Sequence, residues 1–359
     1  MHRREFLQKS AAAAVVTSIA SLNRAAADQE VTAAKLPRWR GFNLLEKFIA
    51  PRSGRSGRYH QEDFEWIAGW GFDFVRLPLD YRCWTPGKDW KEISEPVLKE
   101  IDEAVEVGKQ HQIHVCINFH RAPGYCVNPP AEPFDLWSED AALEACAYHW
   151  SHFAQRYKGI PNSQVSFNLL NEPGRVPEAA YHKVVKRLTE AIREQDPGRL
   201  IIADGLEWGT KPVKSLVKLK IAQSTRGYQP MQVSHYKAGW VRGSDRWPMP
   251  TWPLEEAGKP KVDKEKLRQQ RIEPWKALEK EGVGVHVGEW GAFQLTPHSV
   301  VLAWMRDNLE LWKEAGWGWA LWNLRGSFGI LDSGRKDVAY EDFQGHQLDR
   351  KMLDLLRSK

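Results

Sequence analysis

Two glutamates stand at the ends of apolar runs of the kind that form buried strands. Glu172 ends the first run within the motif Asn-Glu-Pro at 171–173, and Glu289 ends a second run at 283–288. Proline cannot extend a strand ladder, so the first strand stops there. In an α/β barrel, such strand ends meet on the face that carries chemistry. Two carboxyl groups on that face can flank a glycosidic bond, one donating a proton while the other attacks the sugar carbon.

Either glutamate alone is also compatible with an ordinary strand-end carboxylate that faces solvent or an arginine. Three further acids, Asp80, Asp204 and Glu207, lie near the ends of other expected strands. Glu207 is the strongest rival for a catalytic role, but it lacks the neighbouring asparagine and the tight turn. The presence of Glu172 and Glu289 together, on regularly spaced strands, favours the catalytic interpretation.

The elements that must position these acids alternate along the whole chain. Eight strand patterns are expected at 39–45, 71–79, 113–120, 165–171, 200–204, 231–236, 283–288 and 318–324. Helical patterns follow them at 61–70, 97–110, 139–157, 177–194, 212–219, 264–281, 297–315 and 348–356. This count predicts an α/β fold, a single-domain (β/α)8 TIM barrel. A doubly wound open sheet is the structural alternative, but it usually stops at five or six strands.

Length and composition agree with one exported globular domain. The chain has 359 residues, 42% hydrophobic and 27% charged, without a linker or a low-complexity segment. Residues 1–27 have a charged head with an Arg3-Arg4 pair, a weak apolar middle and small residues at the end, which is typical of a twin-arginine signal peptide. The alternative is a basic amphipathic helix that begins the fold. We expect a catalytic domain at 28–359 and export to the periplasm or the cell exterior.

Charge and hydropathy exclude several classes of partner. Four basic residues and one acidic residue lie in 1–27, so the formal charge of +5 falls to about +2 in the remainder. That balance does not indicate nucleic-acid binding, and the basic run at 211–220 is typical of a solvated helix face. No apolar segment reaches the roughly 20 residues of a membrane span. We expect a monomer whose partner is a polysaccharide or oligosaccharide.

The cysteines and histidines do not form a metal-binding pattern. The four cysteines, Cys83, Cys116, Cys126 and Cys146, lack zinc spacing. A disulfide between Cys83 and Cys126 is conceivable after export, because both follow expected strands on one rim, although sequence alone leaves the connectivity open. A metal-dependent barrel hydrolase would be expected to carry a His-x-His pair, and none occurs. We therefore expect no metal and no cofactor.

The expected strand ends collect further polar and aromatic groups suited to sugars. They are Arg76, His120, Asn171 with Glu172, His235 with Tyr236, Glu289 and Trp322. Arg76 is placed to keep Glu289 charged, while His235 and Tyr236 are candidates to orient the carboxyl groups. Trp322 offers a flat apolar face on which a pyranose ring can stack. The alternatives are a structural ion pair for Arg76, an ordinary buried histidine at 120 and a core tryptophan at 322.

These residues resemble glycoside hydrolase family 5, and the likeness spans nearly the whole chain after residue 27. It rests on Arg76 in Val-Arg-Leu-Pro, His120, the Asn-Glu-Pro motif, Glu289 in Gly-Glu-Trp-Gly, and Trp322. The resemblance implies that Glu172 is the acid/base and Glu289 the nucleophile of a retaining (β/α)8 glycosidase. It also implies that Asn171 binds the sugar 2-hydroxyl and that Arg76, His120 and Trp322 line the subsite of the covalent intermediate.

One departure from that family concerns the sixth strand. Family members commonly have a histidine and a tyrosine two positions apart there, whereas this chain reads His235-Tyr236. Neighbouring strand residues point to opposite sides, so both can face inward only with a bulge or a turn. The direction of Tyr236 therefore stays open.

The sequence favours a retaining endo-β-1,4-glucanase. Eighteen tryptophans, several in the expected loops of the active face, suit an extended polysaccharide held by stacking. A β-mannanase and an exo-β-1,3-glucosidase are the alternatives within the same chemistry. A non-catalytic carbohydrate-binding barrel is the alternative of another class.

Overall fold

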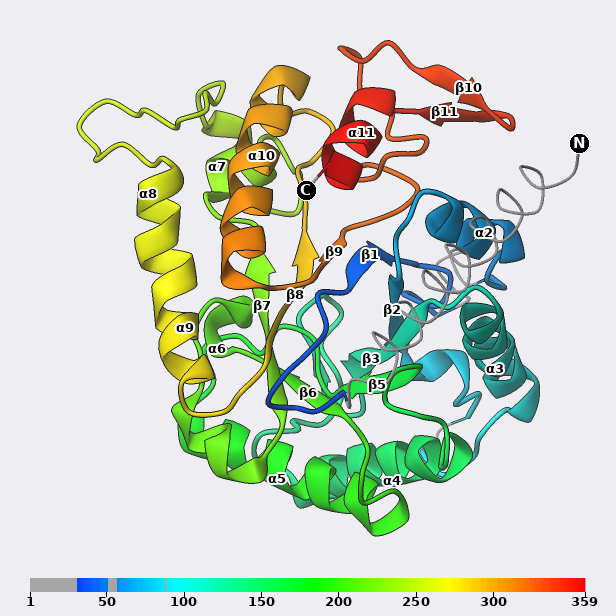
Figure 1. The fold of residues 1–359 in the computed structure, drawn as a ribbon. Helices are drawn as coiled ribbons and strands as arrows, with labels where there is room; N and C mark the ends of the chain where they lie inside the picture. Colours follow the sequence, from blue (N-terminus) through cyan, green and yellow to red (C-terminus); the bar gives the residue numbers. More distant parts are fainter. Residues whose placement is uncertain (1–30, 51–56, 88, 359) are drawn as a thin grey trace, which may run out of the picture. The chain divides into compact units, whose positions relative to one another are not determined.

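Eight parallel strands close into a barrel in the computed structural model, which describes residues 31–50, 57–87 and 89–358 (Figure 1). They are β1 (Arg40–Asn43), β2 (Phe74–Asp80), β3 (His114–Ala122), β5 (Val165–Asn168), β6 (Ile201–Asp204), β7 (Ala222–Gly227), β8 (Val285–Trp290) and β9 (Trp319–Leu321). Pairing of β1 with β9, and of β2 with both β1 and β3, completes the ring. The two-residue strand β4 (Tyr125–Cys126) pairs antiparallel to β3. The prediction of a single-domain (β/α)8 barrel is confirmed.

Helices connect successive strands, as the alternating pattern requires. The longer helical segments are α2 (Gln61–Gly69), α3 (Glu95–Gln110), α4 (Asp140–Arg156), α5 (Glu178–Gln195), the run α8 (Lys264–Leu267), η5 (Arg268–Ile272) and α9 (Glu273–Glu279), α10 (His298–Ala315) and α11 (Arg350–Ser358). Helix α3 shows why they form: Leu98, Ile101 and Val105 recur at helical spacing and are buried against the barrel. The segment after β6 holds only the four-residue helix α6 (Leu206–Gly209) and the 3₁₀ helix η3 (Lys214–Leu219).

The expected sixth strand was wrong. Residues 231–236 begin as the short helix α7 (Met231–Ser234), and the sixth barrel strand is instead β7, nine residues earlier. Strand β7 reads Ala-Gln-Ser-Thr-Arg-Gly, which has no apolar run although every residue in it is buried. Its polar side chains find buried partners, as when Gln223 hydrogen-bonds the backbone of Val213 in the segment before β7. Hydrophobicity therefore could not reveal this strand.

The apolar core lies between the barrel strands and the surrounding helices. Trp150 on α4 stacks on Phe119 of β3 with ring centroids 3.9 Å apart. Trp312 of α10 packs edge-on against Trp290 of β8 at 4.7 Å. Aromatic pairs of this kind add directional contacts to area burial and fix each helix against its strand. Within the described residues, no helix has the length and apolar character needed to cross a membrane.

A stack of neutral aromatic groups fills the end of the barrel where the strands begin. His114 lies 3.6 Å from the ring of Trp39, and His286 lies 4.6 Å from the ring of Phe74, measured between centroids. His114 is held by Ser166 Oγ at 2.7 Å. Burial lowers the pKa of both His114 and His286 to about 3.

Acidification is expected to destabilise the fold between pH 6.5 and 4 through these histidines. The folded chain keeps them neutral, while the unfolded chain protonates them below about pH 6.5, so stability is lost as pH falls. Each contributes a slope of about 1.4 kcal/mol per pH unit. Urea unfolding across this range should show a smaller slope in His286→Gln than in the parent chain. The matched control His60→Gln, at an exposed position, should keep the parent slope; an unchanged slope in His286→Gln would contradict the assignment.

Two further expectations concerned a signal peptide and a disulfide. The expected signal peptide at 1–27 lies outside the described residues. The structure contains no disulfide in its described part, and it holds Cys83, Cys116, Cys126 and Cys146 as thiols. The Sγ atoms of Cys83 and Cys126 approach different backbone oxygens, of Lys47 and His120.

Candidate active site

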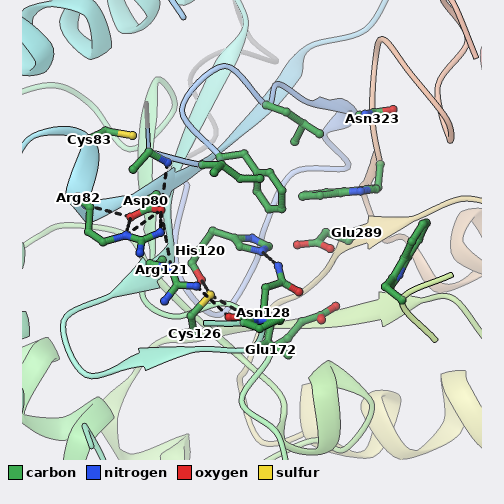
Figure 2. Close-up of a pocket in the computed structure, with 18 of the residues that line it drawn as sticks. Asp80, Arg82, Cys83, His120, Arg121, Cys126, Asn128, Glu172, Glu289 and Asn323 are labelled. Carbon is green, nitrogen blue, oxygen red and sulfur yellow. Dashed lines mark hydrogen bonds and ion pairs between the residues drawn. The ribbon is translucent and has the colours of Figure 1, made fainter. Parts of the chain in front are cut away.

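A cavity of about 1280 Å³ lies at the end of the barrel where the strands finish. Five residues expected at the site line it: His120, Glu172, His235, Glu289 and Trp322. Figure 2 shows Glu172 and Glu289 projecting toward the same space, with His120 beside them. The two glutamates, 117 positions apart in the chain, thus come together at one barrel mouth.

Glu289 reaches the cavity because β8 contains an extra residue. The pairing of β8 with β7 runs from Thr225 opposite Val287 to Arg226 opposite Glu289, so Gly288 has no partner on β7. Such bulges redirect the next side chain, and they are common beside active sites.

Three donors then fix the Glu289 carboxylate. Its Oε1 accepts hydrogen bonds from Arg76 Nη1 at 2.6 Å and from Arg226 Nη2 at 3.3 Å. Its Oε2 accepts one from the hydroxyl of Tyr228 at 3.2 Å. Positive charge and donors on both oxygens suit an ionised carboxylate.

Glu172 is presented by a backbone held in the left-handed region. Its φ is +50°, an uncommon value for a residue with a side chain. The conformation is held from both sides: the Glu172 amide donates to Asp204 Oδ2 at 2.8 Å, and its carbonyl accepts from the Tyr125 hydroxyl at 2.8 Å. Conformations of this kind persist where surrounding contacts over-determine them, often at functional sites.

The environments of the two carboxyl groups differ. Burial raises the pKa of Glu172 well above its ordinary value, and repulsion from the nearby Glu289 carboxylate adds to the rise. One guanidinium donor contacts Glu172, from Arg226 Nε to Oε1 at 3.0 Å, whereas Glu289 receives two arginines and a tyrosine. Glu172 is thus suited to hold a proton near neutral pH, and Glu289 is placed to attack.

Arg76 and Asn171 form the floor beneath the two acids. Arg76 lies on β2 and is almost completely buried, and it donates to Asn43, Asn168, Asn171 and Glu289. The expected pairing of Arg76 with Glu289 is therefore present. The Oδ1 of Asn171 accepts from both Arg76 and Arg226, while its Nδ2 is buried without a partner among the described residues.

His120 and Trp322 form one wall of the cavity. Their rings stack with centroids 5.7 Å apart, and Phe48 packs edge-on against both. His120 Nε2 lies 3.1 Å from the amide nitrogen of Asn128, which is a donor, so the ring proton is assigned to Nδ1. Burial lowers the pKa of His120 well below its usual value, so the ring stays neutral.

The opposite wall is aromatic, and it corrects the expected roles of His235 and Tyr236. His235 lines the cavity after α7, with Tyr228, Trp240 and Phe328 around its ring. It contacts Ser234 rather than a carboxyl group, at 2.8 Å. Tyr236 is buried and does not line the cavity. His235 therefore lies at the cavity as expected but contacts no carboxyl group, and Tyr236 lies outside the cavity, because the segment after residue 230 is a helix and a turn, not a strand.

Arg226 and Tyr228 take the places that the sequence interpretation gave to His235 and Tyr236. They are two positions apart at the end of the true sixth strand, which is the family spacing, but arginine stands where the family commonly has histidine. The spacing was therefore a usable signal, although the arginine concealed it. Asp204 also enters the site, whereas Glu207 is half exposed and pairs with Lys211 at 3.8 Å.

The long segment from 238 to 262 contributes a tryptophan to the cavity. Trp240 is 61% exposed and lines the cavity, packed edge-on against Phe293 at 4.9 Å. Trp252 instead donates from its indole nitrogen to Asp307 of α10 at 2.8 Å, which anchors the segment. One tryptophan thus lines the cavity while another fixes the segment to α10.

Two carboxyl groups in unequal environments, linked by arginines at the mouth of a (β/α)8 barrel, meet the requirements for cleaving a glycosidic bond. The fold and the site define the class, and this chain is a glycoside hydrolase. A model of the family described as cellulase (glycosyl hydrolase family 5) matches residues 27–327. The chain belongs to glycosyl hydrolase family 5.

Relatives and solved structures agree with this membership. The chain is 26% identical over 305 residues to endoglucanase C of Acetivibrio thermocellus, covering 78% of this chain and 88% of the relative. It is 24% identical over 258 residues to cellodextrinase A of Ruminococcus flavefaciens, covering 68% and 72%. A crystal structure described as a glycoside hydrolase superposes with a TM-score of 0.85 at 38% identity, covering 89% of this chain and 99% of that one.

A more distant structure shares the fold. Endoglucanase Cel5A from Thermotoga maritima has a TM-score of 0.70 at 23% identity, covering 89% of this chain and 96% of that one. Structures of Cel5A have been solved with mannotriose and with cellobiose.

Proposed function

We propose that this chain is an exported retaining endo-β-1,4-glucanase with Glu172 as the acid/base and Glu289 as the nucleophile. The observation that carries the proposal is that one guanidinium, of Arg226, contacts both carboxyl groups across a single cavity. Retaining enzymes need their carboxyl groups about 5 Å apart, closer than the roughly 6.5 to 9.5 Å of inverting enzymes. Two carboxyls joined through one guanidinium fit the shorter spacing.

In the first step a Glu289 oxygen attacks the anomeric carbon. The bond from that carbon to the leaving oxygen breaks, and the Glu172 proton moves to this oxygen, so that a neutral alcohol leaves. Arg76 and Tyr228 hold the attacking carboxylate by hydrogen bonds to different oxygens. Glu289 becomes a glycosyl ester, and Glu172 becomes a carboxylate.

In the second step Glu172 accepts a proton from a water molecule that attacks the same carbon. The ester bond breaks, the sugar leaves with its original configuration, and Glu289 regains its charge. Asn171 is placed next to Glu172, and its partnerless Nδ2 is suited to donate to the sugar 2-hydroxyl. Trp322 and His120 are suited to hold the ring that carries the ester.

The choice of β-1,4-glucan is supported by the aromatic lining of the cavity and by the relatives. The wall of Trp240, Phe293 and Phe328 gives apolar faces for more than one sugar ring. The names endoglucanase C and cellodextrinase A refer to glucan and to cellodextrin, respectively. A β-mannanase is the second candidate, favoured by the mannotriose complex of Cel5A. An exo-β-1,3-glucosidase ranks third.

Trp208 is expected to hold the leaving-group side of the glycan. It is 44% exposed, its amide donates to the carbonyl of Pro173 at 2.9 Å, and the Arg175 guanidinium lies 5.8 Å from its ring. Replacing Trp208 with alanine should raise KM for a soluble β-glucan about tenfold, because one ring loses its stacking partner. Hydrolysis of an aryl cellobioside should change little, since its leaving group is not a sugar. Equal losses on both substrates would contradict this placement.

Export by the twin-arginine route is supported by the residues of 1–27. A bacterial host that expresses the full chain should release activity to the periplasm, and Arg3→Lys with Arg4→Lys should retain it in the cytoplasm. Cytoplasmic activity from the parent chain would contradict the proposal.

Activity on a panel of polysaccharides tests the substrate. Carboxymethylcellulose, mannan, xyloglucan and laminarin are incubated with the enzyme, and product lengths are resolved with time. Early release of mixed oligosaccharides from carboxymethylcellulose, with retained β-configuration by NMR, is the expected result. Preference for mannan, or release of single glucose units from laminarin, would favour one of the alternatives. Inverted products would overturn the mechanism.

A further inference from the structure

The Arg226 side chain contacts five other polar residues of the site. Its side chain is 1% exposed and donates from Nε to Glu172, from Nη1 to Ser224, and from Nη2 toward Asn171, Asp204 and Glu289. The two proposed catalytic carboxyl groups therefore share one permanently charged donor.

Asp204 holds this guanidinium from β6. It is fully buried on β6, and its Oδ2 accepts from both Arg226 Nη2 and the Glu172 amide. Its Oδ1 accepts from Asn168 at 2.9 Å. The same carboxylate thus positions Arg226 and the backbone that presents Glu172.

Gly288 leaves the space that the guanidinium occupies. A Cβ atom at this position would lie 2.7 Å from Arg226 Nη1 and 2.5 Å from Ser224 Oγ. The extra residue in β8 is therefore one that leaves room for an arginine. The glycine at 288 and the extra residue in β8 thus both accommodate the Arg226 side chain.

The charged groups near Glu172 and Arg226 are few. They are Arg76 on β2, Asp204 on β6, Glu289 on β8 and Arg271, which shares a small cavity of about 10 Å³ with Arg226. The other titratable groups facing them stay neutral near pH 7, because burial lowers the pKa of His120 and His286 and raises the pKa of Cys116, Tyr125, Tyr181 and Tyr228. Changes of charge at Arg226 or Asp204 therefore act on Glu172 and Glu289.

We propose that Arg226, held by Asp204, is a positioning residue that stabilises the negative charge on Glu289 in the free enzyme and on Glu172 in the glycosyl-enzyme. The inference rests on the proposed function. When Glu289 forms the ester it loses its charge, and Glu172 gains one as it gives up its proton. Because the Arg226 guanidinium already contacts both carboxyl groups, it can stabilise the negative charge on either of them without moving. Arg76 cannot do this, because it contacts Glu289 but not Glu172.

The second step should depend most on Arg226. Glu172 must be ionised in the glycosyl-enzyme to take a proton from water, and the contact from Arg226 Nε favours that form. An opposite charge at this distance moves a carboxyl pKa by about 1 to 3 units. The rate of deglycosylation falls at low pH as Glu172 becomes protonated, and this fall is the acid limb of its pH profile. In Arg226→Gln the acid limb should move to higher pH by about one unit or more. Release below that limb then slows about tenfold or more.

Asp204→Asn should move the acid limb in the opposite direction. Loss of its negative charge leaves Arg226 uncompensated beside Glu172, so the same limb should move to lower pH. A purely structural defect would not move the limb in opposite directions in the two variants. Arg226→Lys keeps the charge, so its limb should stay near that of the parent enzyme.

The test uses the full-length enzyme and 2,4-dinitrophenyl β-cellobioside, whose leaving group needs no proton, so that kcat reports deglycosylation. The burst of dinitrophenol, kcat and KM are measured across pH for the parent and each variant, with thermal unfolding as a check on folding. The expected signature of Arg226→Gln is a larger burst with kcat and KM falling together. Arg199→Gln is the matched control, since it removes a buried arginine paired with Asp196 away from the cavity.

The outcomes separate the inference from the proposed function. Opposite movement of the limb in Arg226→Gln and Asp204→Asn, with no movement in Arg199→Gln, supports the inference. An unmoved limb, or movement in one direction in both variants, overturns it. If neither variant of Arg226 folds, Asp204→Asn decides alone: a shift to lower pH supports the inference and no shift overturns it. No turnover by the parent enzyme overturns the proposed function, and this inference with it.

Discussion

Replacement of Glu289 by alanine is expected to lower kcat on β-glucan by about 10⁴-fold or more, the scale seen when a catalytic nucleophile is removed. Arg76, Arg226 and Tyr228 all donate hydrogen bonds to the Glu289 carboxylate, which holds it in place as the candidate nucleophile. Without it, the first covalent bond cannot form. The loss should appear with polysaccharide and with 2,4-dinitrophenyl β-cellobioside alike, because both substrates need the same nucleophile in the first step.

Azide gives this variant a diagnostic second readout. A small anion can occupy the space left by the carboxylate and attack the anomeric carbon from the same side. The product should be an α-cellobiosyl azide, with inverted configuration, detected by NMR. Glu207→Ala is the matched control, because it removes a half-exposed carboxylate that pairs with Lys211 outside the cavity. Substantial residual turnover in Glu289→Ala, or a β-azide product, would show that Glu289 is not the nucleophile.

The same variant distinguishes an enzyme from a binding barrel. Glu289 has both oxygens hydrogen-bonded within the protein, so its removal is expected to change oligosaccharide affinity far less than turnover. Calorimetry with cellotetraose on Glu289→Ala, compared with the parent chain under non-hydrolysing conditions, measures this difference. A barrel that only binds would show parent-like binding and no turnover in either chain.

Most of the barrel was predictable because its strands are apolar. Strands β5 and β8 are buried throughout, and each begins with a valine or phenylalanine at every second position, so both remain recognisable although Ser166, Asn168 and His286 interrupt them. Strand β7 breaks this rule, because its inward positions include Ser224 and Arg226, whose side chains hydrogen-bond each other. When the inward side chains of a strand bind site residues, the strand has a polar composition like that of a loop. Its burial is then visible only from the strands and helices that pack around it.

The site was predictable where chemistry coincides with a strand end, and unpredictable where it depends on pairing. Glu172 and Glu289 each follow an apolar run, and parallel topology then places both on one rim. The contacts of Arg226 with Asp204 require the register of β7 beside β6 and the extra residue in β8. Spacing along the chain does not encode such a register. Tyr236, whose direction the sequence left open, lies outside the cavity because helix α7 stands where the sixth strand was expected.

Glu172→Gln is expected to lose activity selectively, by about 10² to 10⁴-fold on polysaccharide, the usual contribution of general acid–base catalysis. A sugar alkoxide is a poor leaving group without a proton, whereas dinitrophenolate leaves unaided. The first step on 2,4-dinitrophenyl β-cellobioside should therefore stay near the parent rate, while the second step slows for want of a base. Burst kinetics with accumulation of the glycosyl-enzyme, detected by mass spectrometry, should record this separation.

The pH profile tests whether Glu172 is the proton donor. Burial and the neighbouring Glu289 charge raise the pKa of Glu172, so the parent enzyme keeps its proton to higher pH and loses it on the alkaline side. The alkaline limb of kcat/KM on polysaccharide should be absent from Glu172→Gln, because glutamine does not titrate. Azide should restore turnover of the aryl cellobioside by Glu172→Ala and give a β-cellobiosyl azide, since the acid/base side of the intermediate is then open. Equal losses on both substrates, with the alkaline limb intact, would assign proton donation to another group.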